Sequence, residues 1–260
     1  MTDPISHSSE WDFPNPATPL GSPPYYAVRF SAPERHRLYA LLFAWRDLIV
    51  AIGHNPQDPG VARLKLDWWR EEIGAITDSR PRHPLAEALQ DAGLGEPALT
   101  PMHGLIDAVE RAVVRDGLAD DGEFARACRD EGGSFFLLLE ALEQDAGYGP
   151  ERCVALGAYC NAVERLRLSA VRPDRVPRDL ARLPDDDPQG AGRRERCDAL
   201  CRYPGERNSL PNEPVPAICR RLVALQRGLH GKLIRKGYPL GHTLIDRAPI
   251  AHLWTAWRCR

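Results

Sequence analysis

The chain of 260 residues carries 34 Lys and Arg against 36 Asp and Glu, a formal net charge of −2. A chain without excess positive charge has no global field to attract nucleic acid, so we exclude a polybasic nucleic-acid-binding protein. With 43% hydrophobic residues it can bury most of its surface around one core, so a single globular domain is the first expectation.

The cysteines and the N-terminus indicate the compartment. The seven cysteines are scattered, without the paired C-x2-C clusters of structural zinc sites. The first residues lack the basic and apolar stretches of a secretory signal, and no window is apolar enough to span a membrane. We therefore expect reduced thiols and a cytoplasmic protein, with any membrane contact peripheral and at the inner membrane face.

Residues 1–24 contain six prolines among Ser, Thr and Asn. A segment of this composition buries too little apolar surface to offset the conformational entropy that it loses on ordering. We expect a flexible Pro-rich arm here, and a folded domain over residues 25–260.

Helix start signals and helical spacing of apolar residues fill most of that domain. Ser31 and Glu34 have the spacing of a capping box, and apolar residues then follow one helical face as far as Ile52. Asp58-Pro59 and Thr100-Pro101 each combine an N-cap side chain with a proline in the first turn. Further helices are expected over 122–146, from Pro150 to Leu166, over 218–233, and near Trp254 and Trp257.

The segment 172–216 is rich in Pro, Asp, Arg and Gly, which predicts a long loop with one short helix. Within it, Asp185-Asp186-Asp187 is interpreted as a solvated acidic loop. Strand signals are nearly absent along the whole chain. The sequence therefore predicts an all-α fold, a bundle of six to eight helices whose ligand sites lie between facing helices.

Several local strings together resemble the squalene/phytoene synthase family of head-to-head isoprenoid synthases. The most specific is Leu66-Asp67-Trp68-Trp69-Arg70-Glu71-Glu72-Ile73, followed by His83-Pro84-Leu85. The other similar strings are Ser22–Arg29 with Pro33-Glu34-Arg35, Leu38–Leu41, Leu156-Gly157 with Leu166-Arg167, Val176-Pro177 with Asp179-Leu180, and Lys232-Leu233-Ile234 with Gly237-Tyr238. The resemblance covers about residues 22–260 and implies the single-domain, all-helical isoprenoid (terpenoid) synthase fold with a central cavity.

Enzymes of this family are similar in carrying one D-x-x-x-D motif on each of two helices. Carboxylates four residues apart share a helical face, and two such faces hold Mg²⁺ ions that clamp a diphosphate. The resemblance places the first motif within residues 48–54, where no carboxylate occurs; nearby Asp47 has Ala51 four residues on. It places the second motif at Leu168 and Arg172. The chain therefore looks like a degenerate member that lacks both motifs.

The missing carboxylates leave two functions open. In the first, the protein has kept the fold and lost catalysis, needs no metal cofactor, and binds an isoprenoid or lipid-like ligand or serves as an assembly partner of another protein. The family that this chain resembles includes a non-catalytic mitochondrial branch, which assists the assembly of respiratory complex I. In the second, the chain is an active head-to-head prenyltransferase of squalene or phytoene biosynthesis with an unorthodox Mg²⁺ site.

Five residues are candidates for ligand binding, and no catalytic residue is assigned. Arg29, Arg167 and Arg172 would hold an anionic head group directly, because guanidinium groups bind phosphate without a metal. Tyr26 and Tyr39 would add pocket hydroxyls. Each has a structural alternative: Arg29 as a surface charge, the tyrosines as core aromatics, Arg167 as part of a solvated helix face, and Arg172 as the start of a solvated loop.

Overall fold

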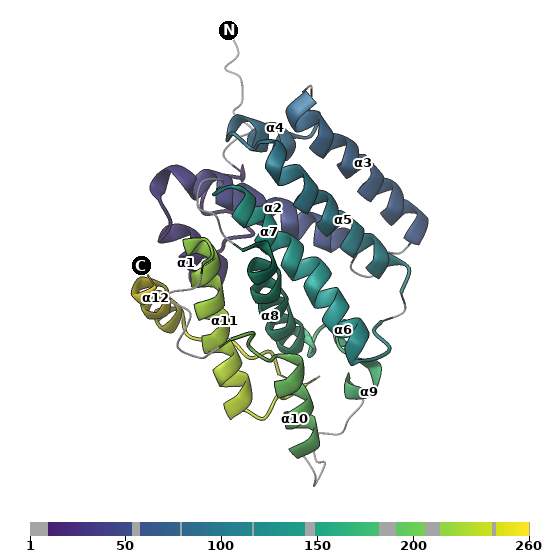
Figure 1. Ribbon diagram of the computed structural model, residues 1–260, viewed down its shortest axis with the longest axis vertical. Coiled ribbons are helices and arrows are strands. Elements are labelled where there is room, and N and C mark those ends of the chain that lie inside the picture. Colours follow the sequence, from purple (N-terminus) through teal and green to yellow (C-terminus); the bar gives the residue numbers. More distant parts are fainter. Residues whose placement is uncertain are drawn as a thin grey trace.

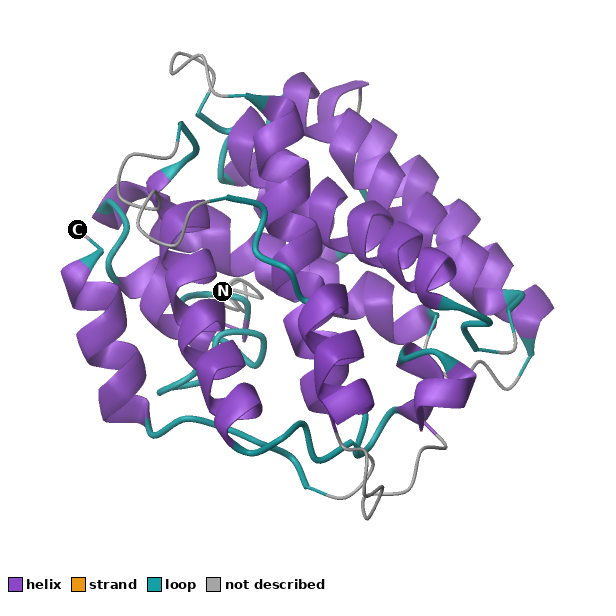
Figure 2. Cartoon of the chain, turned by 60° about the horizontal axis from the view of Figure 1, so that its bottom comes forward, coloured by secondary structure: helices purple, strands orange, loops and turns teal. Residues whose placement is uncertain are grey.

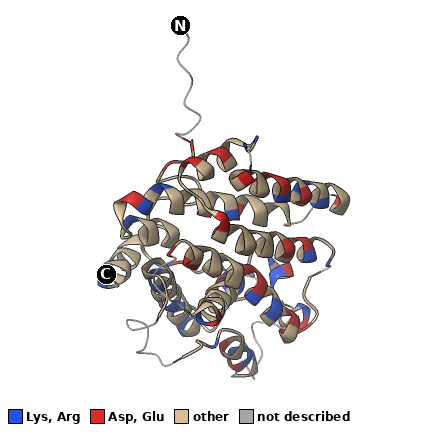
Figure 3. Cartoon of the chain, turned by 45° about the horizontal axis from the view of Figure 1, so that its top comes forward, with Lys and Arg blue, Asp and Glu red and all other residues tan. Residues whose placement is uncertain are grey.

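A computed structural model describes residues 10–53, 58–78, 80–115, 117–143, 149–181, 191–205, 214–240 and 243–259. In these ranges every regular element is a helix, so the all-α class is confirmed; Figure 2 shows only helices and loops. Lys and Arg lie beside Asp and Glu on the same helices in Figure 3, in keeping with the balanced net charge. All seven cysteines are free.

Five long helices form the body of the domain. They are α2 (His36–Ile52), α3 (Pro59–Asp78), α5 (Leu99–Val113), α8 (Pro150–Leu168) and α11 (Ala217–Arg235). Around them lie the shorter α1 (Pro23–Arg29), α4 (Pro84–Asp91), α6 (Asp121–Cys128), α7 (Ser134–Ala141), α9 (Arg178–Ala181), α10 (Ala191–Leu200) and α12 (Pro249–Arg258). Figure 1 shows α8 in the centre of the bundle, with α3 at one edge and α12 at the opposite edge.

The helix start signals had mixed outcomes. The Asp58 carboxylate accepts hydrogen bonds from the backbone N–H groups of Gly60 and Val61, which confirms it as the cap of α3. The capping box at Ser31 is wrong, because its hydroxyl donates to the Ala27 carbonyl at the end of α1, at 2.8 Å. A 3-10 turn then leads into α2.

Two further start and loop predictions need correction. Helix α5 begins at Leu99, so Thr100 lies inside the first turn rather than at the N-cap. The segment 172–216 contains both α9 and α10 rather than one short helix. The acidic run at 185–187 lies outside the described residues.

Residues 10–24 pack on the bundle, so this part of the predicted flexible arm is wrong; residues 1–9 lie outside the described ranges. The buried Asn15 side chain donates hydrogen bonds to the carbonyls of Trp11 and Ala40, both at 3.0 Å. Its amide oxygen accepts from the backbone N–H of Thr18. These polar contacts order the segment together with Trp11, Phe13 and Ala17, which pack against the core.

We expect Asn15→Ala to lower the free energy of unfolding by about 1–3 kcal/mol, because it leaves buried backbone groups without partners. Chemical denaturation measures the loss. Glu10→Ala is the control, since Glu10 is exposed at the start of the same segment. Equal stability of the two variants would show that Asn15 does not order the segment.

A π-helical turn, Arg129–Gly133, joins α6 to α7 and packs against the middle of α8. At the contact, Gly132 faces Gly157, and a Cβ atom on either glycine would collide with the carbonyl oxygen of the other. Two backbones therefore meet without side chains between them. This contact sets the position of Glu131, the residue before Gly132, against α8.

Gly157→Ala is expected to cost about 3 kcal/mol or more, because neither backbone can give way to the added methyl group. Gly74→Ala is the matched control: Gly74 is also inside a long helix, but a Cβ there would meet no atom within 4 Å. That variant should gain about 0.5–1 kcal/mol through the higher helix propensity of Ala. Thermal and chemical denaturation compare the pair, and similar stabilities would contradict the close backbone contact.

Candidate functional site

A cavity of about 570 Å³, which we call the larger cavity, lies between α2, α7, α8 and α11. The segment 16–24 and the stretch before α12 contribute the rest of its wall. Its apolar lining includes Phe43, Phe135, Phe136, Leu222 and Leu229. The cavity therefore offers an aromatic and aliphatic interior of the kind that takes up small apolar molecules.

Arg167 on α8 ties the wall of this cavity together. Its Nη1 donates to Glu164 at 2.9 Å, its Nη2 to Asp246 at 3.2 Å, and its Nε to the carbonyl of Ile245 at 2.9 Å. These bonds fix the chain before α12 against α8. They bring Arg247, the next residue along, to the cavity wall.

Two other arginines of the wall keep unused hydrogen-bonding capacity. Arg46 on α2 lies 3.7 Å from the carboxylates of Asp47 and Glu131, but its buried Nε has no hydrogen-bond partner among the described residues. The Arg247 guanidinium rests against the bare backbone of Gly228 on α11. In the described chain its one side-chain hydrogen bond goes to a threonine hydroxyl at 3.4 Å, and no carboxylate lies within 4 Å of it.

Two groups on this wall have shifted pKa values. Desolvation lowers the pKa of Arg247, and the nearby Arg235 adds to the effect. Desolvation also raises the pKa of Asp47; the charges of Glu164 and Glu131 act in the same direction, and Arg46 opposes them. Asp47 and Glu164 therefore approach the cavity from α2 and α8 closely enough to repel each other.

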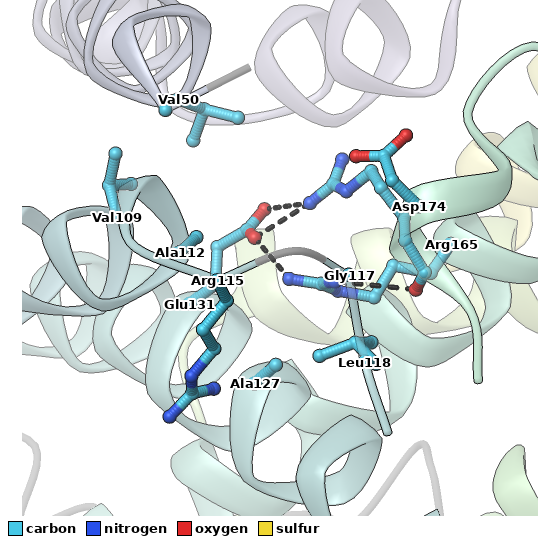
Figure 4. Close-up of a pocket in the computed structure, with 12 residues that line it drawn as sticks. Val50, Val109, Ala112, Arg115, Gly117, Leu118, Ala127, Glu131, Arg165 and Asp174 are labelled. Carbon is cyan, nitrogen blue, oxygen red and sulfur yellow. Dashed lines mark hydrogen bonds and ion pairs between the residues drawn. The ribbon is translucent and has the colours of Figure 1, made fainter. Parts of the chain in front are cut away.

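The smaller cavity, of about 70 Å³, contains a buried ion cluster (Figure 4). Glu131 accepts hydrogen bonds from Arg165 at 2.7 Å, from Arg175 at 2.6 and 2.8 Å, and from Asn161 at 3.0 Å. Desolvation acts to raise the pKa of Glu131, but the charges of Arg175, Arg165 and Arg46 outweigh it and hold that pKa well below its usual range. One carboxylate thus stays ionised between two buried guanidinium groups.

This cluster lies beside the positions where the family resemblance places carboxylates. Val50 and Gly53, from the predicted first motif, line the smaller cavity, and Figure 4 shows Val50 on the wall facing the cluster. At the second motif, Leu168 ends α8, and Arg172 is held by both oxygens of Asp174, at 3.1 and 2.9 Å. Among the described residues no three His, Cys, Asp or Glu side chains form a group suited to a metal ion.

Of the five candidate ligand-binding residues, only Arg167 lines the larger cavity. Arg29 is exposed in the last turn of α1, and Arg172 is engaged by Asp174 beyond the end of α8. The buried Tyr39 donates to Glu143 at 2.8 Å, and the half-buried Tyr26 packs edge-on against its neighbour Tyr25.

The sequence interpretation missed three residues that dominate the two cavities: Arg46, Arg247 and Glu131. A signal existed for Arg46, because Arg46-Asp47 is a charged pair inside the otherwise uncharged stretch Leu38–Ile52 of α2. Glu131 and Arg247 stand in polar stretches and carry no such signal. Their importance follows from packing alone.

Residues 21–168, more than half of the chain, match the family model described as squalene/phytoene synthase. The chain belongs to the squalene/phytoene synthase family. Among solved structures, it is similar to a dehydrosqualene synthase in complex with ligand, with a TM-score of 0.65 and 13% identity over 91% of this chain and 89% of that one. At this identity the likeness shows only the fold, which is that of the isoprenoid synthases. The expected family and the expected fold are therefore both confirmed. A search of curated proteins found no match.

Glu131→Gln should lower the free energy of unfolding at pH 7 by about 3–5 kcal/mol, because it leaves two buried guanidinium groups without a counter-charge. Folding depresses the pKa of Glu131, so its stabilisation is present above the ordinary value of 4.5 and is lost as pH falls through the lower folded-state pKa. The difference between wild type and variant should therefore shrink below pH 4.5.

The control for this experiment is Glu71→Gln, which breaks an exposed ion pair with Arg82. An exposed pair contributes about 0–1 kcal/mol, so this variant should remain close to wild type. Denaturant titrations from pH 3 to pH 7 compare the three proteins. A Glu131→Gln loss as small as that of the control would contradict the buried cluster.

Proposed function

We propose that this member of the squalene/phytoene synthase family does not transfer prenyl groups and instead binds an anionic isoprenoid or lipid-like molecule in the larger cavity. The observation that supports this most is the unused hydrogen-bonding capacity of two arginines in the larger cavity. In the smaller cavity, Arg165 and Arg175 are bound to Glu131. The wall of the larger cavity carries acidic residues as well, but among the described residues Arg46 and Arg247 make no hydrogen bond to a carboxylate.

The loss of catalysis follows from the chemistry of the motif positions. Mg²⁺ requires oxygen ligands in an octahedral arrangement, and ionisation of an allylic diphosphate needs that charge close by. Ile49 and Val50 are buried apolar residues, and Arg172 brings a positive charge that Asp174 already binds. These residues do not fit a magnesium clamp, so we derive no step through one.

The proposed ligand follows from the wall of the larger cavity. Its volume of about 570 Å³ suits a small amphiphile. Arg46 and Arg247 can donate charge-assisted hydrogen bonds to a phosphate or carboxylate without a metal. The phenylalanines and leucines of the interior would receive the apolar chain. The head-group residues of this proposal are therefore Arg46 and Arg247, and no longer Arg29 and Arg172. Arg167 holds the wall in place, because each nitrogen of its guanidinium group already donates within it.

The absence of catalysis is tested with farnesyl diphosphate and Mg²⁺. We expect no release of pyrophosphate above a heat-inactivated control, because the motif positions provide no ligand for the metal. Turnover that EDTA abolishes would contradict the proposal.

Ligand binding is tested by calorimetric titration with farnesyl monophosphate. We expect binding that survives EDTA, weakens with added salt, and falls about 10- to 100-fold in Arg247→Ala, the equivalent of one charge-assisted hydrogen bond. Arg29→Ala is the matched control, since Arg29 is exposed and lies outside the cavity lining. Equal affinity of the Arg247 and Arg29 variants would contradict the proposed head-group site.

An active prenyltransferase is the second candidate. The observation that favours it is the approach of Asp47 and Glu164 to one cavity from two facing helices. In that case Asp47→Asn would abolish an EDTA-sensitive release of pyrophosphate. Under the first proposal there is no activity for this substitution to remove.

A further inference from the structure

The last helix, α12, turns a row of large apolar side chains to solvent. Ile250, Leu253, Trp254 and Trp257 are 68%, 37%, 58% and 47% exposed. Their spacing of three, one and three residues places them on one side of the helix, which we call the tryptophan face. The opposite side, with the buried His252 and Ala256, holds α12 on the bundle. The two tryptophan rings lie 5.2 Å apart, so the face presents a continuous aromatic surface.

The tryptophan face adjoins the larger cavity. Leu20, which is 75% exposed, precedes Gly21, and Gly21 lies in close contact with Pro249 at the start of α12. Leu20 and Pro249 are both exposed and both line the larger cavity. The apolar surface therefore begins where that cavity reaches the exterior.

Positive charge gathers at the other end of α12. Arg258 is exposed in the last turn, and the half-buried Arg220 and Arg227 of α11 lie near the next residue, Cys259, whereas Arg221 between them is buried. The acidic Asp246 lies at the opposite end, before α12, where Arg167 binds it. An exposed aromatic face with arginines at its end thus exists on a chain whose net charge is slightly negative.

We propose that α12 docks this protein on the surface of an anionic lipid bilayer through the tryptophan face. Tryptophan with aliphatic neighbours is the side-chain set that partitions into the head-group region, and arginines beside it add attraction to anionic lipids. No helix in the described chain is both long and apolar enough to cross a membrane.

A bilayer fits this face better than a protein partner. A ten-residue helix is about 15 Å long and about 10 Å wide, whereas each side of a stable protein interface buries roughly 800 Å². Figure 1 shows α12 at the outer edge of the bundle, and the face on it is a single helical row rather than a groove. A lipid surface needs no matching shape. This inference does not depend on what the cavity binds.

The test is co-sedimentation of the full chain with vesicles of phosphatidylcholine alone or mixed with phosphatidylglycerol. We expect binding to the mixed vesicles, at least tenfold weaker binding to phosphatidylcholine, and loss of binding at high salt. Trp254→Ser with Trp257→Ser should weaken binding at least tenfold and remove the blue shift of tryptophan emission on vesicle addition. Arg258→Glu should weaken binding to the mixed vesicles alone.

The matched control is Val61→Ser with Leu64→Ser, which removes two exposed apolar side chains from α3 and should leave binding unchanged. Because the substituted tryptophans are exposed, unchanged thermal denaturation is expected for their variant. The proposal is overturned if wild type fails to bind the mixed vesicles, or if the tryptophan variant binds them as wild type does. A dimer that the tryptophan substitutions abolish, without vesicle binding, would instead assign the face to a second copy of the chain.

Discussion

The ionised Glu131 between Arg165 and Arg175 is the interaction on which the centre of this structure depends. Each charge loses several kcal/mol of hydration on burial, so none is tolerated there without the others. Together they connect the π-helical turn, α8 and the chain that follows α8. The close contact of Gly132 with Gly157 makes the arrangement possible, because it brings the two backbones within reach of one carboxylate.

This cluster also determines which chemistry remains open to the protein. Both oxygens of Glu131 accept hydrogen bonds from the two guanidinium groups, so this carboxylate is not free to bind a metal ion. The larger cavity differs, because within the described ranges the Nε of Arg46 lacks a partner and the Arg247 side chain bonds only to a threonine hydroxyl. In our proposal the chain has retained the fold of an isoprenoid synthase, and the charged residues at its centre stabilise that fold instead of binding a ligand. The arginines on the wall of the larger cavity then bind the anion.

The cavity wall is assembled from distant parts of the chain. Segment 16–24, α8 and the stretch before α12 meet around it, and Arg167 joins the last two. The exposed tryptophan face adjoins this cavity wall at Leu20 and Pro249. The proposed ligand site and the proposed membrane contact are thus neighbours, and each can be tested without the other.

The sequence by itself determined the fold class, the family and much of the helix layout. Apolar spacing and the Asp58 cap are local signals, and the positions of α3, α8 and α11 followed from them. The absence of carboxylates at 48–53, and at 168 and 172, is likewise a property of the sequence alone.

Only the tertiary structure decided which charged residues share a cavity. Arg29 fits the family pattern and Arg172 stands at a position of the second motif, yet Arg29 is exposed and Arg172 is bound by Asp174. Arg46 and Arg247 are some 200 residues apart and meet at one wall. Residues 10–24 are held by the buried amide of Asn15 and by Trp11 and Phe13 packed against the core, although their composition predicts a loose arm. Helical periodicity fixes which residues share a face, but the direction of that face depends on close packing between segments far apart in the chain.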